Sequence, residues 1–221
     1  MRRIAAAVVL LLVTACSAQT VQPPPATPSV VPVAQASKAA LTLADLPKGF
    51  EGGVAPDPSP AVNDGIQYEP GDCWVVRNPM RVLGAPASSV RAQYFVQARD
   101  PMNNQDVQET ISSWTTSAAP LLQRITEGLP GCPTVTGTWV VSLKEPYRVA
   151  VRQLSVPGLK DGIVLGAGFA NTTFKPLSYS AYVVRGNTLL TLQAHNDTFP
   201  TTASFTALLV KAVARLDAVV N

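Results

Sequence analysis

The chain has 221 residues, of which 47% are hydrophobic and 14% charged, and its formal net charge is +3. This composition permits one packed domain with appended segments and excludes a globally disordered chain. The basic residues form no run, which argues against nucleic acid as a partner, because such binding needs a concentrated basic patch.

The N-terminus has the parts of a bacterial export signal. A short positive segment, Met1-Arg2-Arg3, precedes the apolar stretch Ile4–Val13, which is too short to span a bilayer. The following Leu12-Val13-Thr14-Ala15-Cys16 resembles a lipobox. The resemblance implies that residues 1–15 are a cleaved signal peptide and that Cys16 carries diacylglycerol on its sulfur. An ordinary secretory signal that contains a cysteine is the alternative.

Lipid on Cys16 would hold the protein on the outer face of the cell membrane, because each buried CH₂ group contributes about 0.8 kcal/mol. Residues 16–40 then form a Pro/Ala/Ser-rich tether without hydrophobic periodicity, which is linker composition. An ordered N-terminal arm is the alternative for this stretch. Residues 41–221 are predicted to be a single extracytoplasmic domain.

Hydrophobic periodicity predicts the elements of that domain. Apolar residues at three- and four-residue steps predict one helix from Val107 to Leu129, kinked at Pro120, and a second helix over 202–219. Ahead of the strands lie an entry element at 41–50 and a loop at 52–72 that holds at most a short strand near 66–68. The predicted strands are 91–99, 138–144, 147–154, 162–170, 178–185 and 188–195.

Short connections between consecutive strands predict an antiparallel sheet of about five to six strands. The last two strands form a hairpin across Gly186-Asn187, which suits a two-residue turn. Two helices with single apolar faces are then expected to cover one side of the sheet. The fold class is therefore predicted as a two-layer α+β domain.

The cysteine count predicts one disulfide. If Cys16 is lipidated, Cys73 and Cys132 remain as an even pair in an exported protein. Their bond would close a loop of about 60 residues and stabilise the fold by roughly 4 kcal/mol. Two free, buried thiols are the alternative. A metal site is not expected, because two cysteines and one distant histidine lack ligand spacing.

Two pairs of residues are candidates for ligand binding. Tyr68 and Trp74 lie in the loop-rich region around Cys73, where aromatic residues either mark recognition or pack around the disulfide. Arg148 and Arg152 share one face of a predicted strand and offer two guanidinium groups to an anion, unless that face is only solvated.

Catalysis has little support in the sequence. His195 is the single histidine, and no Gly-x-Ser-x-Gly pattern surrounds a serine that it could activate. No glycine-rich loop precedes a helix, so no nucleotide cofactor is expected. An envelope hydrolase that uses His195 is therefore the least favoured function.

Three segments together resemble a known group of proteins. They are the lipobox with its tether, the entry segment LTLADLPKGF at 41–50, and the hairpin SYSAYVVRGNTLLTLQ before the last helix. Together they are similar to mycobacterial and related actinobacterial cell-envelope lipoproteins, and residues 41–221 resemble the extracellular sensor-type domain of mycobacterial serine/threonine kinases. The resemblance implies an antiparallel sheet with two helices, disulfide support and a ligand-holding cleft. The sequence departs from the kinase domains in having one possible disulfide where they usually have two, and it carries no kinase.

These observations favour a membrane-anchored lipoprotein with a non-catalytic binding or sensor-like domain, whose partner is a small molecule, a lipid or an envelope protein. A carrier of a lipid or glycolipid is the alternative. It would need an apolar cavity between sheet and helices, lined by the small residues Gly166, Ala167 and Gly168.

Overall fold

The computed structural model describes residues 29–56, 66–77, 79–96, 105–139, 146–169, 173–195 and 198–220. The predicted signal peptide, Cys16 and the tether as far as residue 28 lie outside the described residues.

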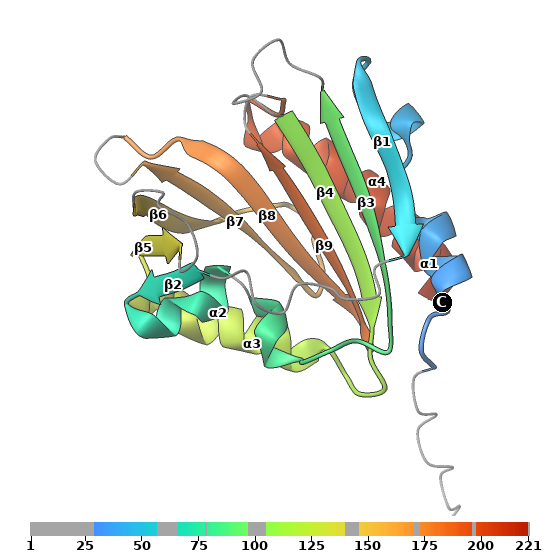
Figure 1. The fold of residues 1–221 in the computed structure, drawn as a ribbon, viewed down its shortest axis with the longest axis horizontal. Helices are drawn as coiled ribbons and strands as arrows, with labels where there is room; N and C mark the ends of the chain where they lie inside the picture. Colours follow the sequence, from blue (N-terminus) through green and yellow to red (C-terminus); the bar gives the residue numbers. More distant parts are fainter. Residues whose placement is uncertain are drawn as a thin grey trace, which may run out of the picture.

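Nine strands form one antiparallel sheet in the described part of the chain. They are β1 (Phe50–Pro56), β2 (Ile66–Glu69), β3 (Ser88–Val96), β4 (Gln105–Ser113), β5 (Thr134–Trp139), β6 (Tyr147–Leu154), β7 (Gly162–Phe169), β8 (Pro176–Arg185) and β9 (Thr188–His195). Their order across the sheet is β1-β3-β4-β9-β8-β7-β6-β5-β2 (Figure 1). The prediction of an antiparallel sheet is confirmed, and the predicted number of five to six strands is wrong.

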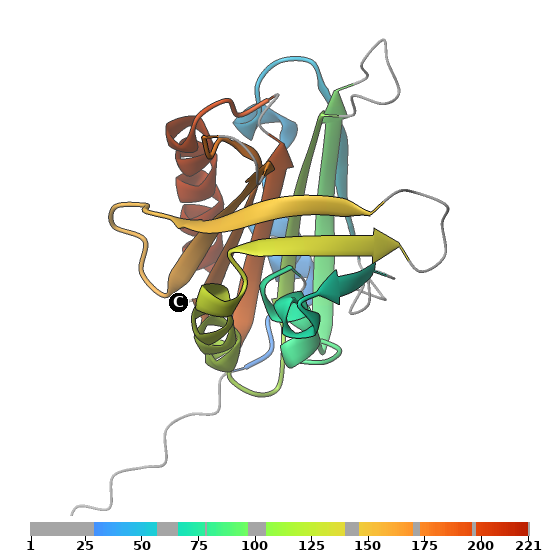
Figure 2. The ribbon, with the colours of Figure 1, turned by 90° about the vertical axis from the view of Figure 1, so that its left-hand side faces the viewer.

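The sheet twists strongly from one edge to the other, as β-sheets do. Figure 2 shows β5 and β6, in yellow, running across the direction of β3 and β4, in green. Two helices pack against one face of the sheet at its β5 end: α2 (Trp74–Arg77) and α3 (Ala119–Gly128). The remaining helices are α1 (Val33–Ala39) and α4 (Thr202–Val220).

The two long helices lie on opposite faces of the sheet. Tyr179, Ala181 and Val183 of β8 belong to the hydrophobic cluster under α4. Their neighbours Tyr182 and Val184 belong to the cluster under α3. The prediction that both helices cover one side is therefore wrong, and the sheet is the middle of three layers (Figure 1). The sequence carries the reason, since β8 and β9 are apolar on both faces, a pattern typical of strands covered on both sides.

The predicted long helix from Val107 is in fact a strand followed by a helix. Residues 105–113 form β4, and α3 begins only at Ala119, with Pro120 in its first turn. The spacing of four residues between Val107 and Ile111 puts both on one face of a helix, but it does the same in a strand, where every second residue shares a face. The β-branched residues and serines at 110–113 then favour the strand.

The edge strand β1 falls in a stretch where the sequence predicted a loop from residue 52 onward. Among the described strands it pairs only with β3, and residues 51–56 are exposed. Its Gly52, Gly53 and Pro56 are poor strand formers, and an edge position is where a sheet tolerates them.

The domain begins earlier than the sequence predicted. Residues 29–40 were assigned to the tether, but Val33–Ala39 form α1, and Val31, Ala36 and Ala39 are buried in the core beneath α4. Alanine-rich composition suits a flexible linker and a short packed helix equally well, so composition alone did not separate them.

Candidate functional site

The disulfide organises the part of the molecule that carries the candidate site. Cys73 and Cys132 are joined, with an S–S distance of 2.01 Å and Cα atoms 5.6 Å apart. Cys73 ends the 3₁₀ turn η2 (Gly71–Cys73) just before α2, and Cys132 follows the turn η4 (Leu129–Gly131) that ends α3. The bond therefore ties α2 to the C-terminal end of α3, and both cysteines are buried.

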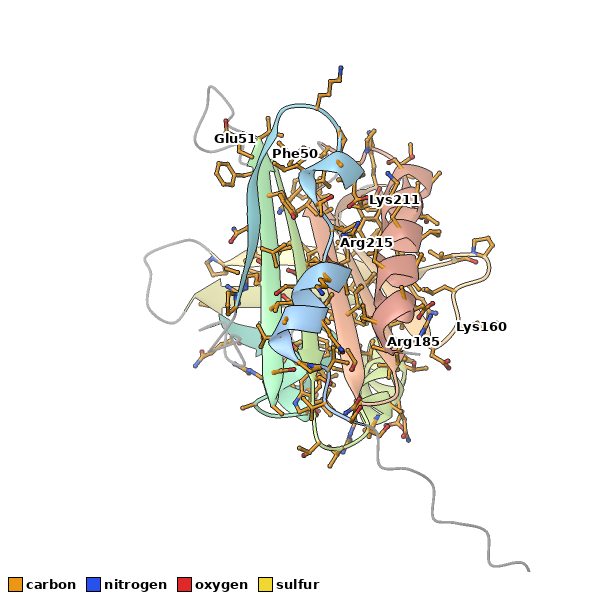
Figure 3. All side chains as sticks on the ribbon, turned by 90° about the vertical axis from the view of Figure 1, so that its right-hand side faces the viewer. Phe50, Glu51, Lys160, Arg185, Lys211 and Arg215 are labelled. Atoms are coloured by element: carbon orange, nitrogen blue, oxygen red, sulfur yellow. A yellow bond between two sulfur atoms is a disulfide. The ribbon has the colours of Figure 1, made fainter. Side chains whose placement is uncertain are left out.

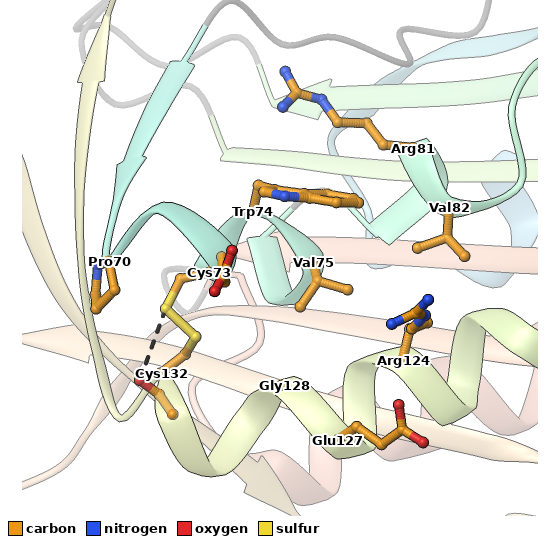
Figure 4. Close-up of a pocket in the computed structure, with 12 residues that line it drawn as sticks. Pro70, Cys73, Trp74, Val75, Arg81, Val82, Arg124, Glu127, Gly128 and Cys132 are labelled. Atoms are coloured by element: carbon orange, nitrogen blue, oxygen red, sulfur yellow. Dashed lines mark hydrogen bonds between the residues drawn. A yellow bond between two sulfur atoms is a disulfide. The ribbon is translucent and has the colours of Figure 1, made fainter.

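A cavity of about 730 Å³ opens beside this disulfide. Its volume falls within the range of 300–1,000 Å³ that is common for small-molecule sites. Its walls come from η2, α2, the turn η3 (Pro79–Val82) and the outer face of α3 (Figure 4). The lining residues are Pro70, Asp72, Cys73, Trp74, Val75, Arg81, Val82, Arg124, Glu127, Gly128, Gly131 and Cys132.

Trp74 and Arg81 form one wall of the cavity. Trp74 is half-buried, and the guanidinium carbon of Arg81 lies 5.9 Å from the centroid of its ring. This distance is within reach of a cation–π interaction. Figure 4 shows the two side chains stacked above Val75. The wall thus combines a flat apolar surface with a positive charge.

The opposite wall is the exposed face of α3. Arg124 and Glu127 both extend from this helix on the side of the cavity, as Figure 4 shows. The Glu127 carboxylate accepts a hydrogen bond of 2.7 Å from the Gln123 side chain. Within the described residues, the Arg124 guanidinium and the Trp74 indole N–H make no hydrogen bond, so both donors are available to a ligand.

A glycine sets the distance between the two walls. A Cβ atom on Gly128 would lie 2.5 Å from a methyl carbon of Val75, so only glycine lets α3 approach α2 this closely. The cavity floor is therefore a direct contact of the two helices beside the disulfide.

Only one of the four predicted ligand-binding residues lines this cavity, namely Trp74. Tyr68 lies in β2, is 7% exposed and packs in the cluster under α3 with Cys73, which is the packing alternative. Arg148 and Arg152 are exposed on β6 and do not line the cavity. Arg152 instead lies 4.5 Å from the ring centroid of Phe174.

Sequence reasoning missed Arg81, Arg124 and Glu127. Arg124 and Glu127 are charged residues on the outer face of a helix, where charges are common and uninformative. The one signal that could have found them is the disulfide, since pairing Cys132 with Cys73 brings the end of that helix next to Trp74.

Gly166 and Gly168 have no side chains, and other residues of the chain pack into the space above them. A Cβ on Gly168 would lie 2.3 Å from the carbonyl oxygen of Lys175, and a Cβ on Gly166 would contact Leu154 and Pro176. At Gly168 a second backbone segment therefore approaches the strand closely. Glycine inside a strand marks the approach either of another backbone or of a ligand, and here it is another backbone.

The space between α4 and the sheet is packed with side chains. Phe205 of α4 stacks on Tyr179 with ring centroids 4.9 Å apart, and both residues are fully buried. Gly166, Ala167 and Gly168 line neither the cavity beside the disulfide nor the two smaller cavities beside Leu159 and beside Asn187. These observations give no support to a lipid carrier with its cavity at this place.

His195 ends β9 and is exposed, and its neighbours Asn196 and Asp197 lie outside the described residues. Among the described residues, no three His, Cys, Asp or Glu side chains gather as a metal site would require. No helix in the described ranges has the length and apolar character needed to cross a membrane.

Comparison with known proteins identifies the fold. No family model and no curated protein sequence matches the chain. Among solved structures, the extracellular domain of the kinase PknH from Mycobacterium tuberculosis matches with a TM-score of 0.61 and 15% identity, over 86% of this chain and 99% of that domain. The Rv0999 orthologue of Mycobacterium smegmatis matches with a TM-score of 0.48 and 14% identity, over 84% and 96% of the two chains. The predicted resemblance to the extracellular domains of mycobacterial kinases is thus confirmed as a likeness of fold.

Proposed function

We propose that this protein is a lipid-anchored envelope protein whose domain binds a ligand without catalysing a reaction. The observation that carries the proposal is the cavity beside the Cys73–Cys132 disulfide, which is lined by the Trp74 ring and by the side chains of Arg81 and Arg124. The likeness of fold to an extracellular kinase domain supports a position outside the cytoplasmic membrane.

The chemistry of the cavity favours a ligand with an anionic group beside an apolar or ring-shaped part. Trp74, Val75 and Val82 supply the apolar surface. The Glu127 carboxylate already accepts a hydrogen bond from Gln123, whereas the Arg124 guanidinium is unengaged within the described residues. Guanidinium groups bind carboxylates and phosphates through paired hydrogen bonds, so Arg124 is the residue that we assign to the anion.

The ligand preference can be tested with two sugars that differ in one group. Glucuronate and glucose are titrated into the purified protein while the Trp74 indole ¹H–¹⁵N signal is followed by NMR, with Trp74→Phe to assign the signal. We expect glucuronate to shift the signal at lower concentration than glucose, and Arg124→Gln to remove the difference. Arg148→Gln, an exposed arginine outside the cavity, is the matched control and should behave as wild type. Equal responses to the two sugars would contradict the preference for an anion.

A separate experiment tests whether the domain holds a ligand at all. The protein is expressed for export in a mycobacterial host, extracted gently and weighed by native mass spectrometry. Additional mass that disappears on denaturation supports a bound ligand. A clean mass, together with no response to envelope lipids, glycans or proteins, would contradict the binding function.

The membrane anchor rests on the lipobox and is tested at Cys16. Growth with an alkyne-bearing fatty acid should label the wild-type protein, which should then partition into detergent. Cys16→Ser should be neither labelled nor cleaved at the expected site. A Cys16→Ser variant that is processed like wild type would indicate an ordinary secretory signal instead.

A further inference from the structure

Residues 31–46, here called the N-terminal arm, run along the face of the sheet that α4 covers. Figure 3 shows the arm, in blue, between β1 and α4, with Lys211 and Arg215 of α4 beside it. The arm includes the last ten residues of the predicted tether and leads from there toward β1. Its contact with the domain therefore decides where the tether ends.

The apolar contact of the arm is small. Its deeply buried side chains are mainly alanines, at positions 36, 39 and 40, with Leu41 as the largest. Val33 is 37% exposed and Leu43 is 46% exposed. Because burial of apolar area contributes roughly 25 cal/mol per Å², an arm of this composition docks with modest free energy. Polar contacts are therefore important for holding it.

Polar contacts fasten the arm at its two ends. The Val31 amide donates to the Ser113 hydroxyl over 3.1 Å. At the other end, the Arg215 guanidinium forms an ion pair of 3.4 Å with Asp45, and it also donates to the Ala39 carbonyl in the middle of the arm over 3.3 Å.

The centre of the arm is fastened to a buried carboxyl group. The Leu41 amide donates to one oxygen of Glu109 over 2.6 Å, and the Tyr94 hydroxyl donates to the Leu41 carbonyl. Glu109 is fully buried on β4, and its other oxygen has no hydrogen-bond partner among the described residues. A buried charge with half of its hydrogen-bonding capacity unused costs several kcal/mol, whereas the neutral acid costs much less.

The groups around Glu109 do not offset this penalty. Tyr94 of β3 is neutral near pH 7, and Asp45 on the arm adds negative charge. Among the described residues, Arg215 of α4 is the one cation that acts on Glu109. Burial, opposed by the Leu41 hydrogen bond and by Arg215, raises the pKa of Glu109 to about 7. Removal of the arm would expose this carboxyl group to water, where the charged form is stable.

We propose that the N-terminal arm is a releasable strap, docked while Glu109 is protonated and freed from the sheet when Glu109 ionises. Release adds the 16 residues of 31–46 to the chain that precedes β1, or about 50 Å at full extension. The domain could then reach further from the membrane, and the strip of sheet under the arm would become accessible.

Hydrogen exchange of the Leu41 amide tests the proposal, since this N–H bonds directly to Glu109. Exchange is measured on the purified protein by NMR from about pH 5.5 to about pH 8 and corrected for the intrinsic pH dependence of exchange. We expect the equilibrium constant for opening at Leu41 to rise more than tenfold over this range. A change of this size follows when the pKa of the Glu109 carboxyl group is about 7 with the arm docked and near its ordinary value with the arm released. Amides of the central strand β9, such as that of Leu192, should stay protected throughout.

Two variants separate the roles of the carboxyl groups near the arm. Glu109→Gln keeps the shape and the acceptor for Leu41, so it should remove the pH dependence of the opening. Asp45→Asn removes the ion pair with Arg215, so it should raise opening at every pH while keeping the pH dependence. An opening at Leu41 that does not change with pH, or that keeps its pH dependence in Glu109→Gln, would overturn the proposal. So would Leu192 exchanging in parallel with Leu41, because the arm would then open only with the whole domain.

Discussion

Glycines in this sheet have unequal importance, and the surroundings of each one decide it. Gly168 lies on β7 at a register irregularity, with the Lys175 carbonyl pressed against its face. Gly53 lies on the edge strand β1 with open space where a side chain would be. The residue type is the same, and only the close approach of a second backbone distinguishes the two sites.

We therefore expect Gly168→Ala to destabilise the protein by about 1–3 kcal/mol, because the added methyl group must displace backbone rather than a flexible side chain. Gly53→Ala should change the free energy of unfolding by less than about 0.5 kcal/mol. Urea denaturation of both variants measures the difference. Equal effects at the two positions would mean that the Lys175 carbonyl does not lie close against Gly168.

The candidate site could be predicted only in part at the level of residues. Cysteine parity in a chain predicted to be exported indicated the Cys73–Cys132 bond, and the neighbouring Trp74 was proposed as a binding residue. Arg124 was not found, because its position relative to Trp74 depends on the packing of α3 against α2. The burial of Glu109 could not be predicted either. A glutamate between polar neighbours in the sequence gives no indication that a segment some 68 residues earlier covers it.

Among the elements, α2 and α3 depend on the disulfide for their relative position. The bond closes residues 59 positions apart in the sequence. α2 has only four residues and could not hold its place by helix formation alone. The walls of the cavity are therefore kept together by a covalent link rather than by a large contact surface.

Replacing both Cys73 and Cys132 by alanine should lower the free energy of unfolding by up to about 4 kcal/mol, the loop-closure value for a loop of this length. Ligand-induced shifts at Trp74 should weaken in the same variant, because α2 is no longer tied to α3. Urea denaturation and the NMR titration provide the two measurements, and the wild-type protein in reductant is the parallel sample. A variant as stable as wild type would show that packing alone positions α2.

Sequence periodicity succeeded where an element has one consistent pattern. The strand at 147–154 and the strand at 188–195 were predicted with the bounds they have, and the last helix differs by one residue. β4 was mistaken for the start of a helix because a spacing of four residues fits both structures. The pattern of a strand covered on both faces hides the alternation that would have identified it.

The corrected boundary at Ala119 gives a prediction for Pro120. Inside a continuous helix, Pro120→Ala would stabilise the protein by about 3 kcal/mol by removing a kink. In the first turn of α3, proline lacks only an N–H that has no helical partner, so the substitution should change stability by less than about 1 kcal/mol. Thermal unfolding of Pro120→Ala decides between the two, and a large stabilisation would contradict the boundary.

At the scale of the whole molecule, the sheet separates two cores. The N-terminal arm and α4 pack on one face, and α2, α3 and the cavity lie on the other. Ligand binding at Trp74 and release of the arm at Leu41 would therefore communicate only through the sheet or around its edge. The two proposals can consequently be tested independently of each other.

Independence of the two cores predicts additivity. Ile111 belongs to the cluster under α4 and Ile125 of α3 to the cluster on the other face. Ile111→Val and Ile125→Val should each destabilise the protein by about 0.5–1.5 kcal/mol, and the double variant should equal the sum within about 0.5 kcal/mol. Urea denaturation of the four proteins gives the coupling energy.

The stacked pair Tyr179 and Phe205 shows what coupling within one core should look like. Their rings are in direct contact, so Tyr179→Leu and Phe205→Leu should be non-additive by about 0.5–1.5 kcal/mol, since either substitution alone removes the stacking. If Ile111 and Ile125 coupled as strongly as this pair, strain would pass readily through the sheet. Communication between the cavity and the N-terminal arm would then be expected, and ligand binding should change exchange at Leu41. Additivity across the sheet, with coupling confined to the stacked pair, would instead leave the proton on Glu109 as the control of the arm.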